Sequence, residues 1–345
     1  MGQLLSHPIE EKELDYKSYT NLTYCIGSMQ GYRMTMEDAH DVKINEHENL
    51  AVFGIFDGHG GKNCSQYLAE HLPKLVFTKL NKIASAVYLK QVKDIDLKDV
   101  FDILKNSFFK IDKDLSHHAN MVNCGSTATV VTIIANYIVV ANTGDSRCIV
   151  SRNGHAKPLS FDHKPSNMGE RVRIENSNGY ILNNRINEVL ALSRAFGDFK
   201  FKLPYLSSSR NKYIKENQKL LGDKLITLPP ELFQVTVEPD IMLYDMQKLD
   251  SPEFLVIACD GVWDCFKNGQ LVKLIRDKLS LGWRLNKIVE YILNDSLTMA
   301  NNYTGIGFDN MTLIIVAIHK KEGETMDDWY ESMKEKILKE KGITR

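Results

Sequence analysis

The sequence predicts an α+β protein made of packed strand and helix layers, not a doubly wound sheet. Apolar runs of strand length, rich in Val, Ile and Phe, follow one another between turn residues. Segments with apolar residues at helical spacing stand in clusters among these runs, so the strict βαβα alternation of a parallel sheet is missing.

Length and composition exclude several classes of protein. The 345 residues suffice for one large domain or two small ones, and 43% hydrophobic with 25% charged residues is ordinary for a globular chain. The 43 Lys and Arg against 44 Asp and Glu disfavour a strongly basic nucleic-acid binder. The longest apolar runs are too short to cross a bilayer, and no secretory signal is expected, because no basic segment followed by an apolar stretch is visible among the first residues.

Each predicted strand is a short apolar run, and each predicted helix repeats its apolar residues three or four positions apart. The predicted strands are 50–56, 128–134, 137–141, 147–150, 254–258 and 311–318. The predicted helices are 101–115, a segment from Gly61 to an end near Pro73, 271–275, 283–293 and 326–337.

The chain is expected to form one continuous folded unit over 23–320. A polar, irregular segment over 1–22 precedes it, and a charged C-terminal helix within 321–345 follows it. In that helix the acidic residues come first and the basic residues last, the order that a helix dipole favours. Residues 200–224 hold seven Lys or Arg against two acids, which indicates an exposed basic insertion.

The cysteines are expected to be reduced, buried packing residues. Without a signal peptide, six cysteines in a chain of this length argue against a disulfide framework. There is no C-x-x-C pair, which disfavours a zinc ribbon, and no C-x5-R loop, which disfavours a thiol phosphatase.

Acidic residues lie at the ends of several predicted strands. Asp57, Asp145 and Asp260 follow apolar runs, and Asp309 lies just before one. Any one of them can be an ordinary turn residue, but in a layered sheet such side chains can meet on one rim. Crowded carboxylates repel one another unless cations neutralise them, and oxygen ligands alone suit Mg²⁺ or Mn²⁺ rather than Zn²⁺.

Other residues fit the same chemistry. Arg33, close to the acidic pair Glu37 and Asp38, can bind an anion while the acids hold metal-bound water. His59 stands between two glycines just after Asp57 and is a candidate general acid, although a lone histidine is usually structural. These residues alone predict a metal-assisted hydrolase that acts on an anionic ester.

A series of motifs resembles those of the metal-dependent protein phosphatases of type 2C. The motifs occur in the family's order and cover roughly 23–319. They are Ser28-Met29-Gln30-Gly31, Arg33, Met36-Glu37-Asp38-Ala39-His40, Phe56-Asp57-Gly58-His59-Gly60-Gly61, Gly125-Ser126-Thr127-Ala128, Asn142-Thr143-Gly144-Asp145-Ser146-Arg147, Asp162-His163-Lys164-Pro165, Leu192-Ser193-Arg194-Ala195-Phe196-Gly197-Asp198, Ala258-Cys259-Asp260-Gly261-Val262-Trp263-Asp264 and Gly307-Phe308-Asp309-Asn310-Met311-Thr312.

The resemblance implies an α-β-β-α sandwich of two antiparallel sheets flanked by helices, with a metal site at the sheet edge. It also implies Mg²⁺- or Mn²⁺-dependent hydrolysis of phosphoserine and phosphothreonine in signalling proteins. Asp57 would bridge two metal ions, the Gly58 carbonyl would bind one of them, and Asp260 and Asp309 would be further ligands.

The remaining roles also follow from the resemblance. Glu37 and Asp38 would act through bound water, and Asp145 and Asp264 match residues that hold a third, weaker metal. Arg33 would grip the phosphate, and His59 would protonate the leaving oxygen. A metal-bridging hydroxide would attack phosphorus directly, so that no phosphoenzyme forms.

The chain departs from the family pattern at two places. Glu188 stands where the family usually has glycine, and the segment after Asp198 is longer and richer in lysine than usual. That segment falls where the family has a flap, so it is either a solvated loop or a surface that favours acidic sequence around the phosphosite.

The N-terminus fits a myristoylation signal. Met1-Gly2-Gln3-Leu4-Leu5-Ser6 matches M-G-x-x-x-[ST], with Gly2 as the acceptor, although so short a pattern also arises by chance. A single myristoyl chain gives only weak, reversible membrane binding. The protein is therefore expected in the cytoplasm, with the nucleus and transient membrane contact left open. A monomer is expected because the sequence shows no dedicated interface motif.

Two alternatives stay open at this stage. One is a catalytically silent module of the same fold that binds phosphoproteins, and the other is a hydrolase of small phosphoesters. Loss of a metal-binding aspartate would favour the silent module, but every one of these aspartates is present. The preferred prediction is an active phosphatase whose partners are phosphoprotein substrates.

Overall fold

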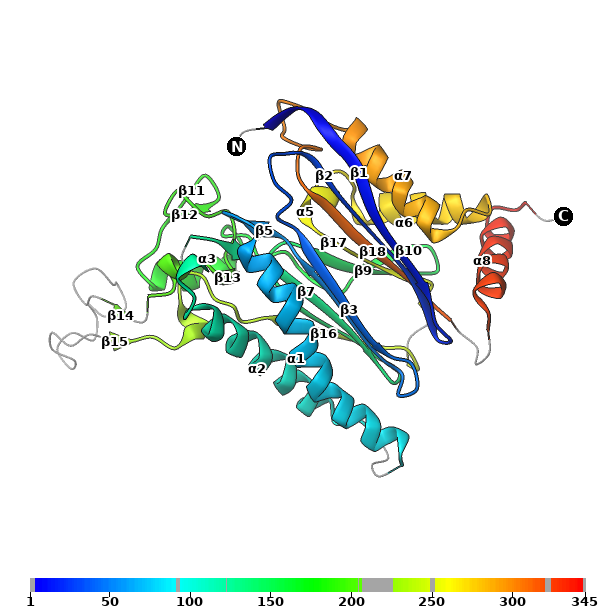
Figure 1. Cartoon of the computed structure of the whole chain (residues 1–345), viewed down its shortest axis with the longest axis horizontal. Helices are drawn as coiled ribbons and strands as arrows, with labels where there is room; N and C mark the ends of the chain where they lie inside the picture. Colours follow the sequence, from blue (N-terminus) through cyan, green and yellow to red (C-terminus); the bar gives the residue numbers. More distant parts are fainter. Residues whose placement is uncertain are drawn as a thin grey trace.

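Two antiparallel sheets pack face to face in the middle of the structure, and helices cover their outer faces (Figure 1). This computed structural model describes residues 4–90, 94–121, 123–203, 205–206, 226–248, 252–319 and 324–343. The first sheet has the strand order β1-β2-β18-β17-β9-β10 and the second the order β16-β8-β7-β4-β3. The predicted α-β-β-α sandwich is confirmed.

The strands of the first sheet are β1 (Leu4–Ser18), β2 (Leu22–Arg33), β18 (Met311–Ile318), β17 (Phe254–Ala258), β9 (Arg147–Arg152) and β10 (His155–Pro158). Those of the second are β16 (Asp240–Asp245), β8 (Tyr137–Thr143), β7 (Ala128–Ile134), β4 (Leu50–Phe56) and β3 (Ala39–Asn45). A small sheet has the order β13 (Phe196–Gly197), β6 (Gly125–Ser126) and β5 (Gly58–His59). Two short pairs are β11 (Ile181–Leu182) with β12 (Arg185–Ile186), and β14 (Tyr205–Leu206) with β15 (Ile226–Thr227).

The central strands are continuous apolar runs because both of their faces are covered. Every residue of β4, β7, β17 and β18 is buried. In β4, Phe53 and Ile55 lie in the core between the sheets, whereas Val52 and Phe56 lie in the core beneath the helices. Such strands lose the alternation of a half-exposed strand, so their apolar runs are conspicuous in the sequence.

The helices form the two outer layers. They are α1 (Asn63–Tyr88) and α2 (Leu97–Leu115) on the second sheet, and α6 (Asn268–Ser280) and α7 (Leu285–Thr298) on the first, with α8 (Met326–Glu340) against α6 (Figure 1). The shorter α3 (Met168–Asn176) and α5 (Asp260–Trp263) lie in connections. Within the described ranges, no helix combines the length and the hydrophobicity that a membrane span requires.

The expectation of an irregular segment over 1–22 is wrong for its described part. Leu4–Ser18 is β1, which pairs antiparallel with β2. Most of its side chains are exposed, and six of its 15 residues are charged, because an edge strand needs few apolar contacts. Pro8 is compatible with that position, since an edge strand has backbone N–H groups that need no partner strand.

The prediction that the first helix ends near Pro73 is also wrong. α1 contains Pro73 and continues to Tyr88. A proline inside a helix costs about 3 kcal/mol relative to alanine. Beyond it, Val76, Leu80 and Ala84 are buried, and this continued packing offsets the cost.

Glu188 occupies a backbone conformation that explains why glycine is usual there. Its φ is +66°, and that of the preceding Asn187 is +49°, both in the left-handed region. The Tyr180 hydroxyl donates a hydrogen bond of 2.9 Å to the Glu188 carboxylate. The departure from the family pattern is therefore confined to one strained turn.

Two predicted features fall mainly on residues outside the described ranges. Gly2 is one of them, and most of the basic insertion over 200–224 is the other. All six cysteines are described and free, with five buried and Cys265 half-buried.

Candidate metal centre

The antiparallel register brings the predicted acids to one end of the sandwich. β3 begins where β4 ends, so Asp38 and Asp57 lie together at this end of the second sheet. β18 begins where β17 ends, so Asp309 and Asp260 lie together at the same end of the first. β8 also ends here, and Asp145 follows it.

The acids crowd into a partly buried cluster. Burial raises the pKa of Asp57 well above its usual range, and the negative charges of Asp260, Asp38, Asp309 and Asp145 raise it further. The same causes, burial first, raise the pKa of Asp260. Carboxylates that cannot all be ionised together in this way call for cations.

Asp38 lies at the meeting point of the sheets. Ligand atoms of Asp38, Asp57 and Cys259 lie within 4.8 Å of one another. Burial raises the pKa of Asp38 to about 7, against the hydrogen bond of 2.8 Å that the Thr312 hydroxyl donates to it. Cys259 is buried as predicted, but its place beside the acids was not predicted.

Glu37 and Gly58 meet across the entrance to the cluster. A Cβ on Gly58 would lie 2.4 Å from the Glu37 carbonyl oxygen, so only glycine allows this approach. The Ser65 hydroxyl donates to the same carbonyl oxygen, and the Gly61 N–H donates to the Glu37 carboxylate at 3.1 Å. These contacts fix the loop that precedes Asp38.

Sequence reasoning named Thr127, Ser146 and Asn310 only as members of motifs and gave them no role. Thr127 holds the backbone of Asp57 with two hydrogen bonds. Its hydroxyl accepts from the Asp57 N–H at 3.1 Å, and its own N–H donates to the Asp57 carbonyl at 2.9 Å. Ser146 lies 2.7 Å from the Thr127 hydroxyl. Asn310 accepts from the Glu37 N–H and donates to the Gln30 carbonyl, both at 2.9 Å, which ties the β2–β3 connection to β18.

Arg33 lies at the rim, at the end of β2. Its guanidinium is 2.5 Å from Asp309, and its side chain is 41% exposed. The free part of this planar cation can form paired hydrogen bonds with a phosphate.

His59 lies on β5 of the small three-stranded sheet and contacts a residue for which no role was predicted. Its Nε2 is 2.6 Å from Asp198 Oδ2. Burial lowers the pKa of His59, but the charge of Asp198 and its hydrogen bond outweigh burial, so the pKa is raised above 6.5.

Asp145 and Asp264 lie on the far side of the cluster, where Lys164 joins them. The Lys164 ammonium forms an ion pair with Asp145, and its charge also lowers the pKa of Asp264, although burial keeps that pKa raised. A lysine therefore lies where the resemblance implies a third metal.

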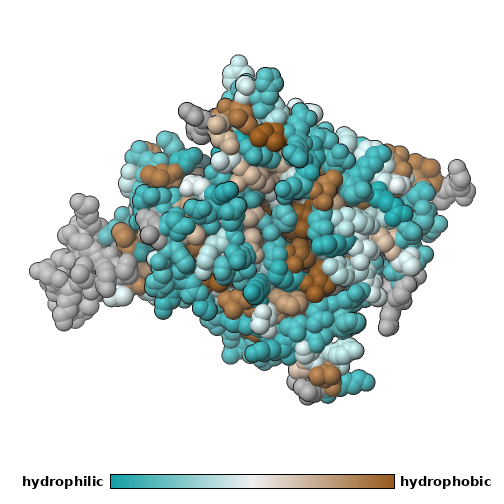
Figure 2. Space-filling view, in the orientation of Figure 1, coloured by the Kyte–Doolittle hydropathy of each residue, from teal (hydrophilic) through white to brown (hydrophobic). Residues whose placement is uncertain are grey.

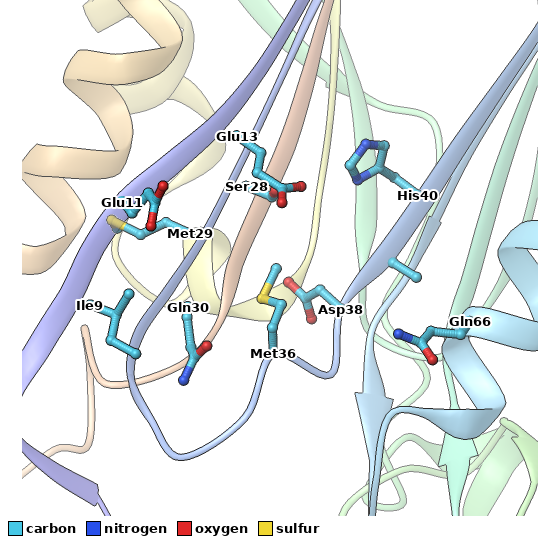
Figure 3. Close-up of a pocket in the computed structure, with 11 residues that line it drawn as sticks. Ile9, Glu11, Glu13, Ser28, Met29, Gln30, Met36, Asp38, His40 and Gln66 are labelled. Atoms are coloured by element: carbon cyan, nitrogen blue, oxygen red, sulfur yellow. The ribbon is translucent and has the colours of Figure 1, made fainter.

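A cleft of about 410 Å³ opens behind Asp38, between β1, β2 and β3 (Figure 3). Glu11, Glu13 and Asp38 supply carboxylates to its wall, and its lining residues include neither lysine nor arginine. On this face of the molecule, apolar side chains gather in a strip near the middle (Figure 2). Carboxylates in this wall disfavour a phosphoester there, whereas Arg33 offers a positive charge to an anion at the rim.

The residues of the cluster fit divalent cations. The donors are carboxylate and carbonyl oxygens, apart from one buried thiol, and the acids destabilise one another without a positive charge. A two-sheet sandwich with such a centre at one end defines a metal-dependent hydrolase.

Comparison with known proteins identifies the family. The sequence model for "Protein phosphatase 2C" matches residues 22–304. The chain is 38% identical to protein phosphatase 2C homolog 4 of Saccharomyces cerevisiae, over 99% of this chain and all of the relative. It is 34% identical to protein phosphatase 2C homolog 3 of Schizosaccharomyces pombe, over 99% of this chain and 75% of the relative.

Solved structures agree on the fold. A phosphatase from Toxoplasma gondii superposes with a TM-score of 0.68 at 23% identity, over 91% of this chain and 98% of that one. A serine-threonine phosphatase 2C from the same organism gives 0.65 at 18% identity, over 90% and 99%. The chain belongs to the protein phosphatase 2C family, the metal-dependent serine/threonine protein phosphatases, whose members depend on Mg²⁺ or Mn²⁺.

Proposed function

We propose that this phosphatase hydrolyses phosphoserine and phosphothreonine by direct attack of water at the acidic cluster. The observation that carries the proposal is the crowding of carboxylates around Asp57 and Asp260, whose pKa values burial and the neighbouring negative charges raise. Asp57, the Gly58 carbonyl, Asp260 and Asp309 would hold two divalent cations. When bound, these cations neutralise charge and activate water as a nucleophile.

The other side chains complete the mechanism. Glu37 and Asp38 orient water at the entrance, since their loop is fixed by Gly61 and Asn310. Arg33 binds the phosphate oxygens from the rim. His59 gives a proton to the leaving serine or threonine oxygen.

Burial of Cys259 argues against a cysteinyl-phosphate intermediate. The Cys259 side chain is fully buried, and burial raises the pKa of its thiol well above 9. A thiol kept protonated and out of reach is a poor nucleophile.

The test of this proposal is phosphate release from a phosphothreonine peptide with Mn²⁺, with and without EDTA. We expect release that EDTA abolishes, with one ¹⁸O atom from labelled water in each phosphate. If the phosphate of the peptide is radiolabelled, radiolabelled phosphate bound covalently to the protein after an acid quench would contradict direct attack. Folded protein without release would favour a silent phosphoprotein-binding module.

We further propose that Asp145 and Asp264 hold a third, weaker cation in competition with Lys164. Lys164→Met removes the competing charge, so the weakest Mn²⁺ site is expected to bind about 10-fold more tightly, a change of about 1.4 kcal/mol. Counting bound Mn²⁺ by electron paramagnetic resonance measures this without reference to activity. Lys74→Met, on the exposed side of α1, is the control. Unchanged Mn²⁺ affinity in Lys164→Met would exclude the competition.

Substrate choice and location are proposals from the sequence. We propose that the basic insertion at 200–224 makes the enzyme prefer phosphoprotein substrates with acidic residues around the phosphosite. Deleting residues 205–222 and comparing hydrolysis of acidic and basic phosphopeptides tests this preference. We also propose that Gly2 is myristoylated, which mass spectrometry of the native N-terminus tests. We propose a monomer that resides in the cytoplasm, in the nucleus or transiently at a membrane, and cell fractionation tests that location.

A further inference from the structure

We propose that Asp198 is the positioning residue for His59, and that the two form a proton-donating pair across a glycine gap. This inference rests on the proposed role of His59 as the acid for the leaving oxygen. It adds a residue, Asp198, for which no role was predicted from the motifs.

The small sheet β13-β6-β5 creates the gap. Its middle strand, β6, pairs Gly125 with His59 on one side and with Gly197 on the other. A Cβ on Gly125 would lie 2.3 Å from Asp198 Oδ2 and 2.5 Å from His59 Nε2. The two side chains can therefore meet over the middle strand only because position 125 is glycine.

Asp198 is held in this place by its backbone. Its φ of +49° lies in the left-handed region, and its N–H donates to the Cys124 carbonyl at 3.1 Å. The preceding Gly197 N–H donates at 2.9 Å to Asp112, which forms a buried ion pair of 2.7 Å with Lys202. An aspartate held in an uncommon conformation by this many contacts has its carboxylate fixed before substrate binds.

The contact decides which ring nitrogen does the chemistry. Because Nε2 donates to the Asp198 carboxylate, Nδ1 is the ring nitrogen that stays available to protonate the leaving group. As the phosphorus–oxygen bond breaks, its electron pair stays on the serine or threonine oxygen, which takes the proton from Nδ1. Water supplies the new oxygen on phosphorus and releases a proton to solvent, and solvent returns a proton to the ring, whose side chain is 31% exposed.

Leaving-group dependence tests the proposal. Asp198→Asn keeps the size of the side chain and tolerates the left-handed backbone, but it removes the carboxylate that orients the ring. We expect kcat on a phosphothreonine peptide to fall about 10- to 100-fold, because its alcohol must be protonated as it leaves. On p-nitrophenyl phosphate, whose leaving group is stable as an anion, we expect a fall of less than about 3-fold.

Three further variants make the result specific. Gly125→Ala should reproduce the selective loss, because its methyl group separates His59 from Asp198. Asp240→Asn disrupts another His–Asp pair, in which Nε2 of His163 is 3.1 Å from Asp240, and should change both substrates alike. Thermal unfolding confirms that each variant is folded, and His59→Gln should show the largest selective loss.

The outcomes separate this proposal from the one on which it rests. Selective loss in His59→Gln with equal loss, or none, in Asp198→Asn overturns the role of Asp198 and leaves His59 as the acid. Without selective loss in His59→Gln, the proposed acid itself is wrong, and the role of Asp198 falls with it.

Discussion

Asp57→Asn is expected to abolish phosphatase activity and, at the same time, to stabilise the metal-free protein. Asp57 is half-buried among four other carboxylates, and burial and their charges raise its pKa. A neutral amide cannot replace the carboxylate that would bridge the cations, so we expect kcat with Mn²⁺ to fall about 10³-fold or more.

The gain in stability has the same origin as the loss of activity. Removing one of several mutually repelling buried acids should raise the free energy of unfolding of the metal-free protein by about 1–2 kcal/mol. Urea denaturation in EDTA measures this, and added Mn²⁺ should stabilise the wild type much more than the variant.

Asp245→Asn is the matched control. Asp245 also ends a strand, β16, but its partner in the register is Tyr137, at the opposite end of the second sheet. This variant should keep both the activity and the response to Mn²⁺. Equal activity in Asp57→Asn and wild type would remove Asp57 from the mechanism.

Glu170→Gln is expected to cause a large decrease in the free energy of unfolding at neutral pH. Glu170 lies on α3, is 6% exposed and accepts hydrogen bonds from Arg173 at 2.8 Å and from Arg194 at 2.7 Å. The amide would remove the carboxylate that pairs with the largely buried guanidinium of Arg173. Arg194 would keep its pair with Asp240 at 2.8 Å but lose the one with Glu170. Breaking such a network costs about 3–5 kcal/mol.

This contribution should disappear in acid. Burial alone would raise the pKa of Glu170, but the hydrogen bond from Arg194 and the charges of both arginines lower it from 4.5 to about 2. At about 1.4 kcal/mol for each pKa unit, that lowering is worth about 3 kcal/mol. The folded-state pKa is the lower one, so the stabilisation is complete above 4.5 and is lost as the pH falls toward about 2.

The measurement is urea denaturation of wild type and Glu170→Gln at neutral pH and again at about pH 3. The difference in free energy of unfolding between the two proteins should be smaller at the lower pH. Glu175→Gln, on the same helix, is the control, because the Glu175–Arg171 pair is about half exposed. It should cost less than about 0.5 kcal/mol. A difference between wild type and Glu170→Gln that is the same at both pH values would contradict this account.

The sequence was most informative where strands are buried on both faces. The bounds predicted for β4, β7, β17 and β18 match the structure because two cores demand an uninterrupted apolar run. β1 was not predicted as a strand because an edge strand needs few apolar residues. The end of α1 was predicted too early because packing beyond Pro73 outweighs the tendency of proline to end a helix.

Residue types and motifs, read from the sequence by itself, determined the family, the sandwich and the acids expected at its rim. The tertiary structure decided which other groups meet them: Asp198 across Gly125 with His59, Lys164 with Asp145, and Cys259 beside Asp38. His59 and Asp198 are far apart in the chain, and no local propensity encodes their approach. It depends on the register of three short strands and on a missing side chain between them, which only the folded chain brings together.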